Sequence, residues 1–346
     1  MENSLQTILE NVSTADSLNL YFIIRQEKEN LVGRRRVLEK YDFSALRVDI
    51  NNEISVSLKR LAKEQLQRAI NKNLELTQYD VISDDQEQVF TYSELNRIGS
   101  FAKVINEQLP NRTLIRTMQN FDEIYNLGLI WAYCIELSYL DDDDSRKYIY
   151  TFRKLNAGNI VVDENDNNPR LAKSFMTLFN TRSNKLEFLK GSAVKLDATI
   201  DCVFDEGIFY ILQKHQFETL VGLAEDFQEQ ANLVVNELQQ LDKIVGLEHV
   251  TNAINTNTAI HKKLVRLKKL QNYAELNDRM IAKMKQAAKA EKYKLKTNAE
   301  GKIIIDNSKD VDMVIKLLCD YYKQGVVTGK NYGTYAGKFF ANTENT

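Results

Sequence analysis

The 346 residues exceed one typical domain, and their 43% hydrophobic and 27% charged content is ordinary for a globular protein. A formal net charge of −2 excludes attraction of nucleic acid by the molecule as a whole, so a polyanion would need a segregated basic patch. Three widely spaced cysteines exclude a disulfide framework, and the longest apolar run, LGLIWAYCI, is too short to span a membrane. We therefore expect a cytoplasmic protein.

The first third of the chain predicts a strand followed by helices. LNLYFIIR at 18–25 combines β-branched and aromatic residues, as strands do. Apolar residues between Ile54 and Ile70 recur at helical spacing, which predicts an amphipathic helix. A second helix is expected from Ser93, a suitable N-cap, to Leu109, because Pro110 closes the element.

Two acidic runs lie near the middle of the chain. WAYCIEL at 131–137 and KYIYTFRK at 147–154 predict a hairpin, so DDDD at 141–144 is expected to be its solvated turn rather than a metal site. DENDNNP at 163–169 begins like a calcium loop, but the glycine and glutamate that such a loop needs are absent. We expect this run to be a polar linker.

The second half begins with strands and ends with helices. Four strands are expected, at 174–180, 185–190, 198–204 and 207–213. Asp205-Glu206-Gly207 suits a tight hairpin turn between the last two. An apolar stripe predicts one long helix over Gln216–Leu241 that covers a sheet, and a hairpin near Gly301 precedes a helix expected at Asp310–Tyr322. The prediction is an α+β fold, with mixed or antiparallel sheets covered by long helices and a helix-rich C-terminal part.

One stretch resembles a known family. The run TIDCVFDEGIFYILQKHQFETLVGLAEDF at 199–227, with WAYCIEL and KYIYTFRKL upstream and GVVTGKNYGTYAGK downstream, resembles the KwaB-like family of the Kiwa anti-phage system. The residues that carry the resemblance are Ile200, Asp201, Phe209 to Ile211, Phe217 and Glu218. It covers roughly 120–340 and suggests an N-terminal α/β region, 1–120, and a KwaB-like domain, 121–346.

The resemblance implies a role and partners. KwaB-like proteins are described as cytoplasmic DNA-binding effectors that obstruct phage DNA replication or transcription. They work with a membrane protein, KwaA, which would recruit them to the inner face of the cell membrane, and they assemble as homo-oligomers, here expected to be a dimer or tetramer. The resemblance brings no catalytic fingerprint, so neither enzyme chemistry nor a cofactor is expected.

A basic tract supports a polyanionic partner independently. Residues 261–296 carry twelve Lys or Arg against three acids, whereas ordinary exposed helices mix Glu with Lys. This imbalance favours DNA binding over a merely solvated helix face. The expected DNA-binding residues are Lys262, Lys263, Arg266, Lys268, Lys269, Lys283, Lys285, Lys289, Lys292, Lys294 and Lys296.

The tract predicts two stripes and a break between them. One stripe contains Lys262, Arg266 and Lys269, and the other runs from Lys285 to Lys296. In one straight helix the stripes would be rotated by about 150° from each other. They face one duplex only if the helix breaks, and NYAELND at 272–278 is the weakest helical stretch.

Two further basic stretches keep alternative interpretations. In KNYGTYAGKFF at 330–340, the aromatic residues either stack on bases or anchor the C-terminus in the core. Arg34 to Arg36 suit a phosphate clamp or an exposed turn between strands.

The sequence offers few candidate catalytic residues. The sequence has no GxSxG, Walker, HExxH or GxGxxG motif. Asp197, Asp201, Asp205 and Glu206 are of the type that holds Mg²⁺ in nucleases, although the last two suit a turn better. Three hypotheses stay open: a DNA-binding effector, a metal-dependent nuclease, and an assembly protein whose basic face meets acidic faces of other copies or the headgroup side of a membrane partner.

Overall fold

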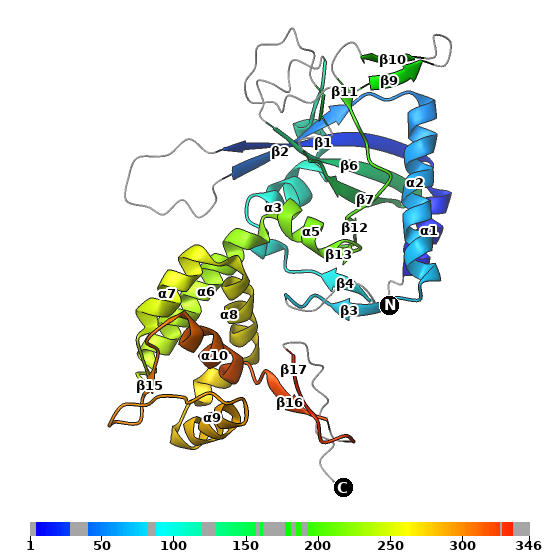
Figure 1. Cartoon of the computed structure of the whole chain (residues 1–346). Helices are drawn as coiled ribbons and strands as arrows, with labels where there is room; N and C mark the ends of the chain where they lie inside the picture. Colours follow the sequence, from blue (N-terminus) through cyan, green and yellow to red (C-terminus); the bar gives the residue numbers. More distant parts are fainter. Residues whose placement is uncertain are drawn as a thin grey trace. The chain divides into compact units, whose positions relative to one another are not determined.

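The structure is a computed structural model (Figure 1) that describes residues 5–27, 41–81, 88–119, 129–156, 160–161, 177–180, 185–188, 193–325 and 327–334. The chain forms two compact units. The sheet unit comprises Met1–Tyr79 and Asp85–Leu223, and the helical unit comprises Asp80–Asp84 and Ala224–Thr346. The expected α+β class is confirmed.

A mixed sheet organises the sheet unit. Among the described residues it has nine strands in the order β3-β4-β13-β12-β7-β6-β1-β2-β5. Their bounds are β1 Ser17–Glu27, β2 Tyr41–Val48, β3 Glu75–Gln78, β4 Gln88–Tyr92, β5 Arg116–Thr117, β6 Leu129–Leu140, β7 Arg146–Lys154, β12 Cys202–Asp205 and β13 Ile208–Ile211. β2 pairs with β5, and β3 with β4, in parallel, while the other neighbours are antiparallel. Strands from both sides of residue 120 share this sheet, which therefore contains parts of both regions expected from the sequence.

Helices cover one face of the sheet around its central strands. α1 (Leu5–Thr14) and α2 (Asn52–Asn71) bury Ile8 and Leu66 in one cluster with Phe22 of β1 and Ile135 of β6 (Figure 1). Asn51 caps α2, its side chain accepting from the Ile54 backbone N–H. The strand expected at 18–25 and the helix expected at 54–70 are confirmed.

Aromatic side chains fill part of the opposite face. The ring of Phe152 on β7 lies 5.9 Å from that of Phe101, and Phe209 on β13 lies 5.2 Å from Phe217. Phe101 belongs to a stretch for which the sequence predicted one helix. The structure has a 3₁₀ turn (Leu95–Arg97), the short α3 (Phe101–Lys103) and a short π-helix (Val104–Gln108) instead. Gly99 interrupts the helix because its φ is 54°.

Both expected hairpin turns of the sheet are present. In the β6–β7 turn the Asp141 carboxylate accepts from the backbone N–H groups of Asp143 and Ser145, which agrees with a structural role for DDDD. In the β12–β13 turn, Glu206 and Gly207 have φ of 43° and 85°, the left-handed values that a two-residue hairpin turn needs. β9 (Thr177–Asn180) and β10 (Lys185–Phe188) form a separate two-stranded pair.

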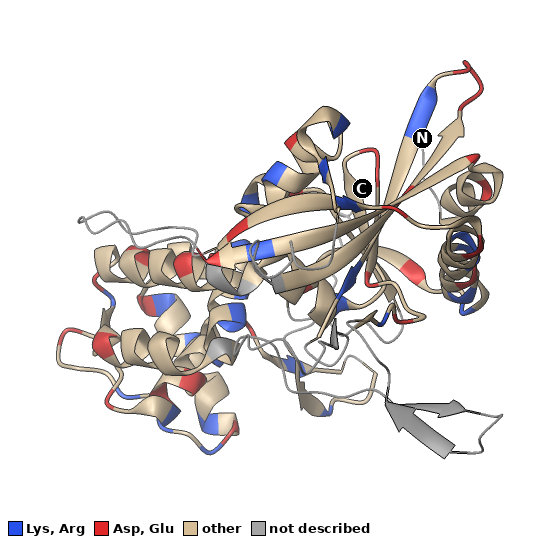
Figure 2. Cartoon of the chain, turned by 90° about the horizontal axis from the view of Figure 1, so that it is seen from above, with Lys and Arg blue, Asp and Glu red and all other residues tan. Residues whose placement is uncertain are grey.

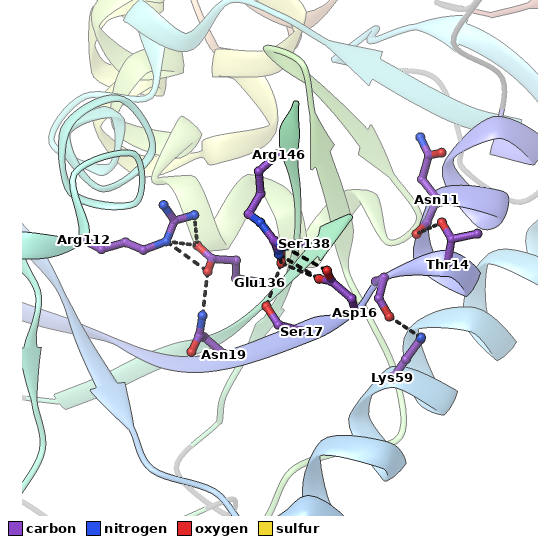
Figure 3. A network of polar contacts seen from close by, with 11 residues as sticks. Asn11, Thr14, Asp16, Ser17, Asn19, Lys59, Arg112, Glu136, Ser138 and Arg146 are labelled. Atoms are coloured by element: carbon purple, nitrogen blue, oxygen red, sulfur yellow. Dashed lines mark hydrogen bonds and ion pairs between the residues drawn. The ribbon is translucent and has the colours of Figure 1, made fainter. Parts of the chain in front are cut away.

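A polar network ties the start of β1 to β6 and β7 (Figure 3). The guanidinium of Arg146 donates to both carboxylate oxygens of Asp16, at 2.8 and 2.9 Å, and to the Ser138 hydroxyl. Beside it, Glu136 is 1% exposed and accepts from Arg112 and Asn19. These pairs satisfy a carboxylate that burial alone would penalise.

The long helix expected at Gln216–Leu241 is wrong in two respects. It is two helices, α5 (Lys214–Val221) and α6 (Leu223–Gln240), because Gly222 ends α5 with φ of 76°. α5 contributes Phe217 to the sheet unit, but α6 buries its apolar stripe in a cluster of helices rather than on a sheet. The division between the two compact units falls at this break.

Helices dominate the helical unit. Besides α6, the described helices are α7 (Leu247–Thr256), α8 (Thr258–Leu270), α9 (Asp278–Ala290) and α10 (Ser308–Leu318). They share one hydrophobic cluster, in which the short parallel pair β14 (Ile244–Val245) and β15 (Ile303–Ile304) also packs. The turn at Gly301 and the helix expected from Asp310 are present, the helix ending at Leu318 rather than Tyr322.

Several stretches singled out in the sequence lie outside the described residues. These are Arg34 to Arg36, DENDNNP at 163–169, and Tyr335 and Phe339 of the C-terminal aromatic stretch. Within the described part of the chain, no helix combines the length and apolarity needed to cross a membrane.

Candidate nucleic-acid interface

The basic tract forms two separate helices, as its pattern predicted. α8 ends at Leu270, its C-cap Gln271 has a left-handed φ of 52°, and a 3₁₀ turn at Asn272–Glu275 follows. Asn277 then caps the N-terminus of α9, its side chain accepting from the Met280 backbone N–H. The expected break at 272–278 is therefore confirmed.

The cations of α8 mostly face the protein. Arg266 is 4% exposed, and its guanidinium donates to the Asp80 carboxylate at 2.6 Å. The Lys263 ammonium donates to Asp312 at 2.7 Å, and that of Lys262 lies 5.9 Å from the Phe227 ring centroid. Lys268 and Lys269 lie in the last turn of α8, where a positive charge stabilises the helix dipole. Of the five, Lys269 is the one that the structure leaves fully on the surface.

The cations of α9 face solvent. Ile281, Met284 and Ala288 form its buried side, and Arg279, Lys283, Lys285 and Lys289 are exposed. Lys285 donates to the Thr297 hydroxyl at 2.9 Å. Within the described parts of the chain, Arg279, Lys283 and Lys289 make no ion pair. Arg279 was absent from the expected site residues, although its place four residues before Lys283 was the available signal.

The row expected from Lys285 to Lys296 is interrupted because α9 ends at Ala290. Lys292 adopts φ of 59° and, like Lys294, is exposed. Lys296 instead pairs with Asp306, at 2.6 Å, and with Asp310, at 3.6 Å. The hydrogen bond to Asp306 raises the pKa of Lys296 and holds the residue in its charged form.

The exposed cations thus form one group. We call Arg279, Lys283, Lys285, Lys289, Lys292 and Lys294 the α9 basic surface. Between Arg279 and Lys294, Glu291 is the only acidic residue in the sequence. Figure 2 shows both signs of charge along the chain, so this surface is identified by individual side chains rather than by net charge. The uncharged residues Ala282 and Gln286 are also exposed on α9, so neither adds a negative charge to this surface.

The acidic residues considered for a nuclease are held by neighbouring side chains of the sheet unit and are not grouped around a metal position. Asp201 is fully buried and accepts from Arg153, at 2.6 Å, and from the Lys154 backbone N–H. Asp197 accepts from the same Arg153 at 3.1 Å. Asp205 is the last residue of β12, where burial, and then the nearby Glu206, raise its pKa to about 6. Among the residues described, no group of three or more His, Cys, Asp or Glu is placed to hold a metal ion.

A second unusual cation lies in the sheet unit. Lys154 is 6% exposed, and its ammonium lies 3.6 Å from the Trp131 ring centroid and donates to the Leu155 carbonyl. The Arg25 guanidinium lies 3.4 Å from the same ring centroid. Burial, and then the charge of Arg25, lower the pKa of Lys154 to about 8.

Comparison with known proteins places the chain in a family. No curated protein and no solved structure matches it. A family model described as Kiwa protein KwaB-like matches residues 127–328. The match includes β6, β7, the β12–β13 hairpin and α6 to α10, and it agrees with the resemblance recognised in the sequence. Since it covers more than half of the 346 residues, the chain belongs to the Kiwa protein KwaB-like family.

Proposed function

We propose that this member of the KwaB-like family is a DNA-binding effector of anti-phage defence. Family membership associates the chain with the Kiwa system. The observation that carries DNA binding is the α9 basic surface, where exposed cations lie together and almost no acid balances them. Like charges four residues apart on a helix destabilise it slightly, and a polyanion relieves that cost.

The chemistry of this surface suits phosphates rather than base edges. Five of its six residues are lysines, whose flexible ammonium groups act as point charges. Neutralising phosphates releases counterions, which supplies most of the binding that does not depend on sequence. The proposed mechanism is occupancy: protein bound along phage DNA obstructs its replication or transcription without enzymatic chemistry or a cofactor.

The proposal includes two kinds of protein partner, which rest on the family alone. One is a membrane protein resembling KwaA, which recruits the chain to the inner face of the cell membrane from the cytoplasm. The other is the chain itself, as a dimer or tetramer. Assembly would place several α9 basic surfaces on one duplex, and linked sites bind more tightly than single ones.

Charge removal tests the interface. In the full chain, Lys283, Lys289 and Lys292 are replaced together by Gln, and affinity for a fluorescent duplex is measured by anisotropy over a range of salt concentrations. We expect weaker binding and a slope of log affinity against log salt that is shallower by about 2 to 3, since each phosphate contact contributes about 0.9. Fold should be retained because all three side chains are exposed.

A matched variant removes the same charge from another helix. Lys63→Gln, Arg68→Gln and Lys72→Gln together alter exposed cations on or beside α2. This control should keep the parental slope. If both triple variants lose affinity equally, the attraction is not specific to α9, and if neither does, the assignment of the α9 basic surface to DNA is wrong.

The same protein tests sequence preference and catalysis. Competition by unrelated duplexes of equal length should be equal, since no recognition-helix or finger motif is present in the sequence. A preference of about 100-fold for one duplex would contradict this expectation, because it exceeds what phosphate contacts provide. Adding Mg²⁺ should leave linear DNA intact, and cleavage would instead support the nuclease hypothesis.

A further inference from the structure

A small hairpin in the helical unit has a distal end that packs against none of the residues the structure describes. β16 (Tyr322–Gln324) and β17 (Asn331–Gly333) pair only with each other and form the arm, Tyr322–Gly333, next to α10 (Figure 1). An isolated two-stranded hairpin is marginally stable unless something supports it. The arm is therefore expected to be supported at its base.

The base of the arm is attached to α10. The backbone N–H of Thr334 donates to the Tyr321 carbonyl, and the Tyr322 hydroxyl donates to Met313 Sδ on α10 at 3.3 Å. The Lys316 ammonium lies 5.3 Å from the Tyr321 ring centroid. These contacts hold the base while leaving the distal residues without a packing role.

The distal residues combine an apolar tip with cations. Val327, at the turn, is 97% exposed, and Tyr332 is 53% exposed. Tyr332 lies directly across from Lys323, which pairs with Asp320 just outside the arm. Lys330 is exposed, and the sequence from 321 to 334 contains no acid. The Gly325 N–H donates to the Lys330 carbonyl, which keeps the turn narrow.

This combination fits DNA better than a protein or a lipid surface. A stable protein interface buries about 800 Å² on each partner, which one valine and one tyrosine do not supply. Amphipathic membrane binding likewise needs an extended apolar face. A DNA wedge needs only one apolar side chain beside a base step, with cations and an aromatic ring near the backbone. A two-stranded ribbon is also narrow enough to enter a groove.

We infer that the β16–β17 arm is a second DNA contact, in which Val327 inserts beside a base step while Lys330 and Tyr332 contact the backbone. The inference rests on the proposed DNA binding of the α9 basic surface, which lies in the same unit. It adds a shape preference to binding that is otherwise insensitive to sequence. DNA that unstacks easily should be bound more tightly, because the cost of opening a step is smaller.

The test measures unstacking directly. Full-chain protein is added to duplexes with 2-aminopurine at a central step, either fully paired or beside a mismatch, and fluorescence and affinity are recorded. The parent should raise the fluorescence and bind the mismatched duplex about tenfold more tightly, since unstacking costs less there. Val327→Ser should abolish both effects without altering the salt slope, because valine carries no charge.

A matched control distinguishes failure of the arm inference from failure of DNA binding by the α9 basic surface. Val245→Ser changes another exposed valine of the helical unit, 45% exposed on β14, and should behave like the parent. If the parent binds DNA with the expected salt slope but shows neither unstacking nor mismatch preference, the arm inference is overturned while the proposed function stands. If DNA does not bind at all, the proposed function fails first. If Val327→Ser keeps the unstacking signal, the inference is overturned. Sedimentation of both proteins with phosphatidylglycerol vesicles then shows whether the tip is a lipid contact, since only the parent would sediment.

Discussion

α8 and α9 are each thirteen residues long and rich in lysine, yet they use their charge differently. α8 packs on most sides, so Arg266 is buried against Asp80 and Lys263 is paired with Asp312. α9 buries one side around Ile281, Met284 and Ala288 and leaves its cations in water without a carboxylate partner among the described residues. The role of a cation therefore depends on how much of its helix is covered, not on its spacing along the helix.

The cations of the two helices also differ in their energetics. A buried ion pair offsets the desolvation of both partners, and removing one partner leaves an uncompensated charge. An exposed cation costs little to keep and remains available to a mobile polyanion. Three substitutions, in order of decreasing effect on stability, test this difference between buried and exposed cations.

Arg266→Ala should have the largest effect. It leaves the Asp80 carboxylate, whose side chain is 14% exposed, without its guanidinium partner. The free energy of unfolding should fall by about 3 to 5 kcal/mol, as for other broken buried pairs. Urea denaturation measures the change. Arg279→Ala on α9 is the matched control and should change stability by less than about 0.5 kcal/mol. Equal effects at the two positions would remove the distinction between the helices.

Lys154→Met should stabilise the protein at neutral pH. Lys154 is as buried as Arg266, but its ammonium is placed against Trp131 and a carbonyl rather than a carboxylate. Its pKa falls from 10.5 when exposed to about 8 in the folded state, so the unfolded chain binds more protons between these values. Parental stability therefore falls as the pH falls through this window and stays lower below pH 8.

The expected gain for Lys154→Met is about 1 to 3 kcal/mol at pH 7, which allows for the lost contacts with Trp131. It should disappear above about pH 10.5, where lysine is neutral in both states. Thermal unfolding at pH 7 and pH 10.5 measures this. Lys63→Met, at an exposed position of α2, should show no such pH dependence. A gain that is the same at both pH values would show that packing rather than charge causes it.

Lys283→Glu should have the smallest effect on folding and an opposite effect on binding. It replaces a like-charge pair with Arg279, four residues away, by an attractive one. The free energy of unfolding should rise by about 0.2 to 0.5 kcal/mol. DNA affinity should fall more than for Lys283→Gln, because a repulsive charge is added at the α9 basic surface. Unchanged affinity with raised stability would separate Lys283 from the DNA contact.

Local patterns in the sequence predicted much of the fold. Strand β1, helix α2, the β6–β7 hairpin and the break between α8 and α9 follow from periodicity, turn residues and caps. The failures were at glycines. Gly99 and Gly222 divide segments whose apolar pattern continues through them, because periodicity does not reveal a left-handed backbone. The broken helix at Gly222 also separates an aromatic contact of the sheet unit from the core of the helical unit.

For the candidate site, the basic tract, its break near 272–278 and the resemblance of the chain to the KwaB-like family could all be predicted from the sequence alone. Which of these cations are exposed depends on the tertiary fold. Asp80 and Asp312, which pair with Arg266 and Lys263, are distant in the sequence, so spacing within the tract gave no sign of them. The exposure of Val327 and the attachment of the β16–β17 arm to α10 could not be predicted from the sequence either, because burial depends on what the rest of the chain places against a residue.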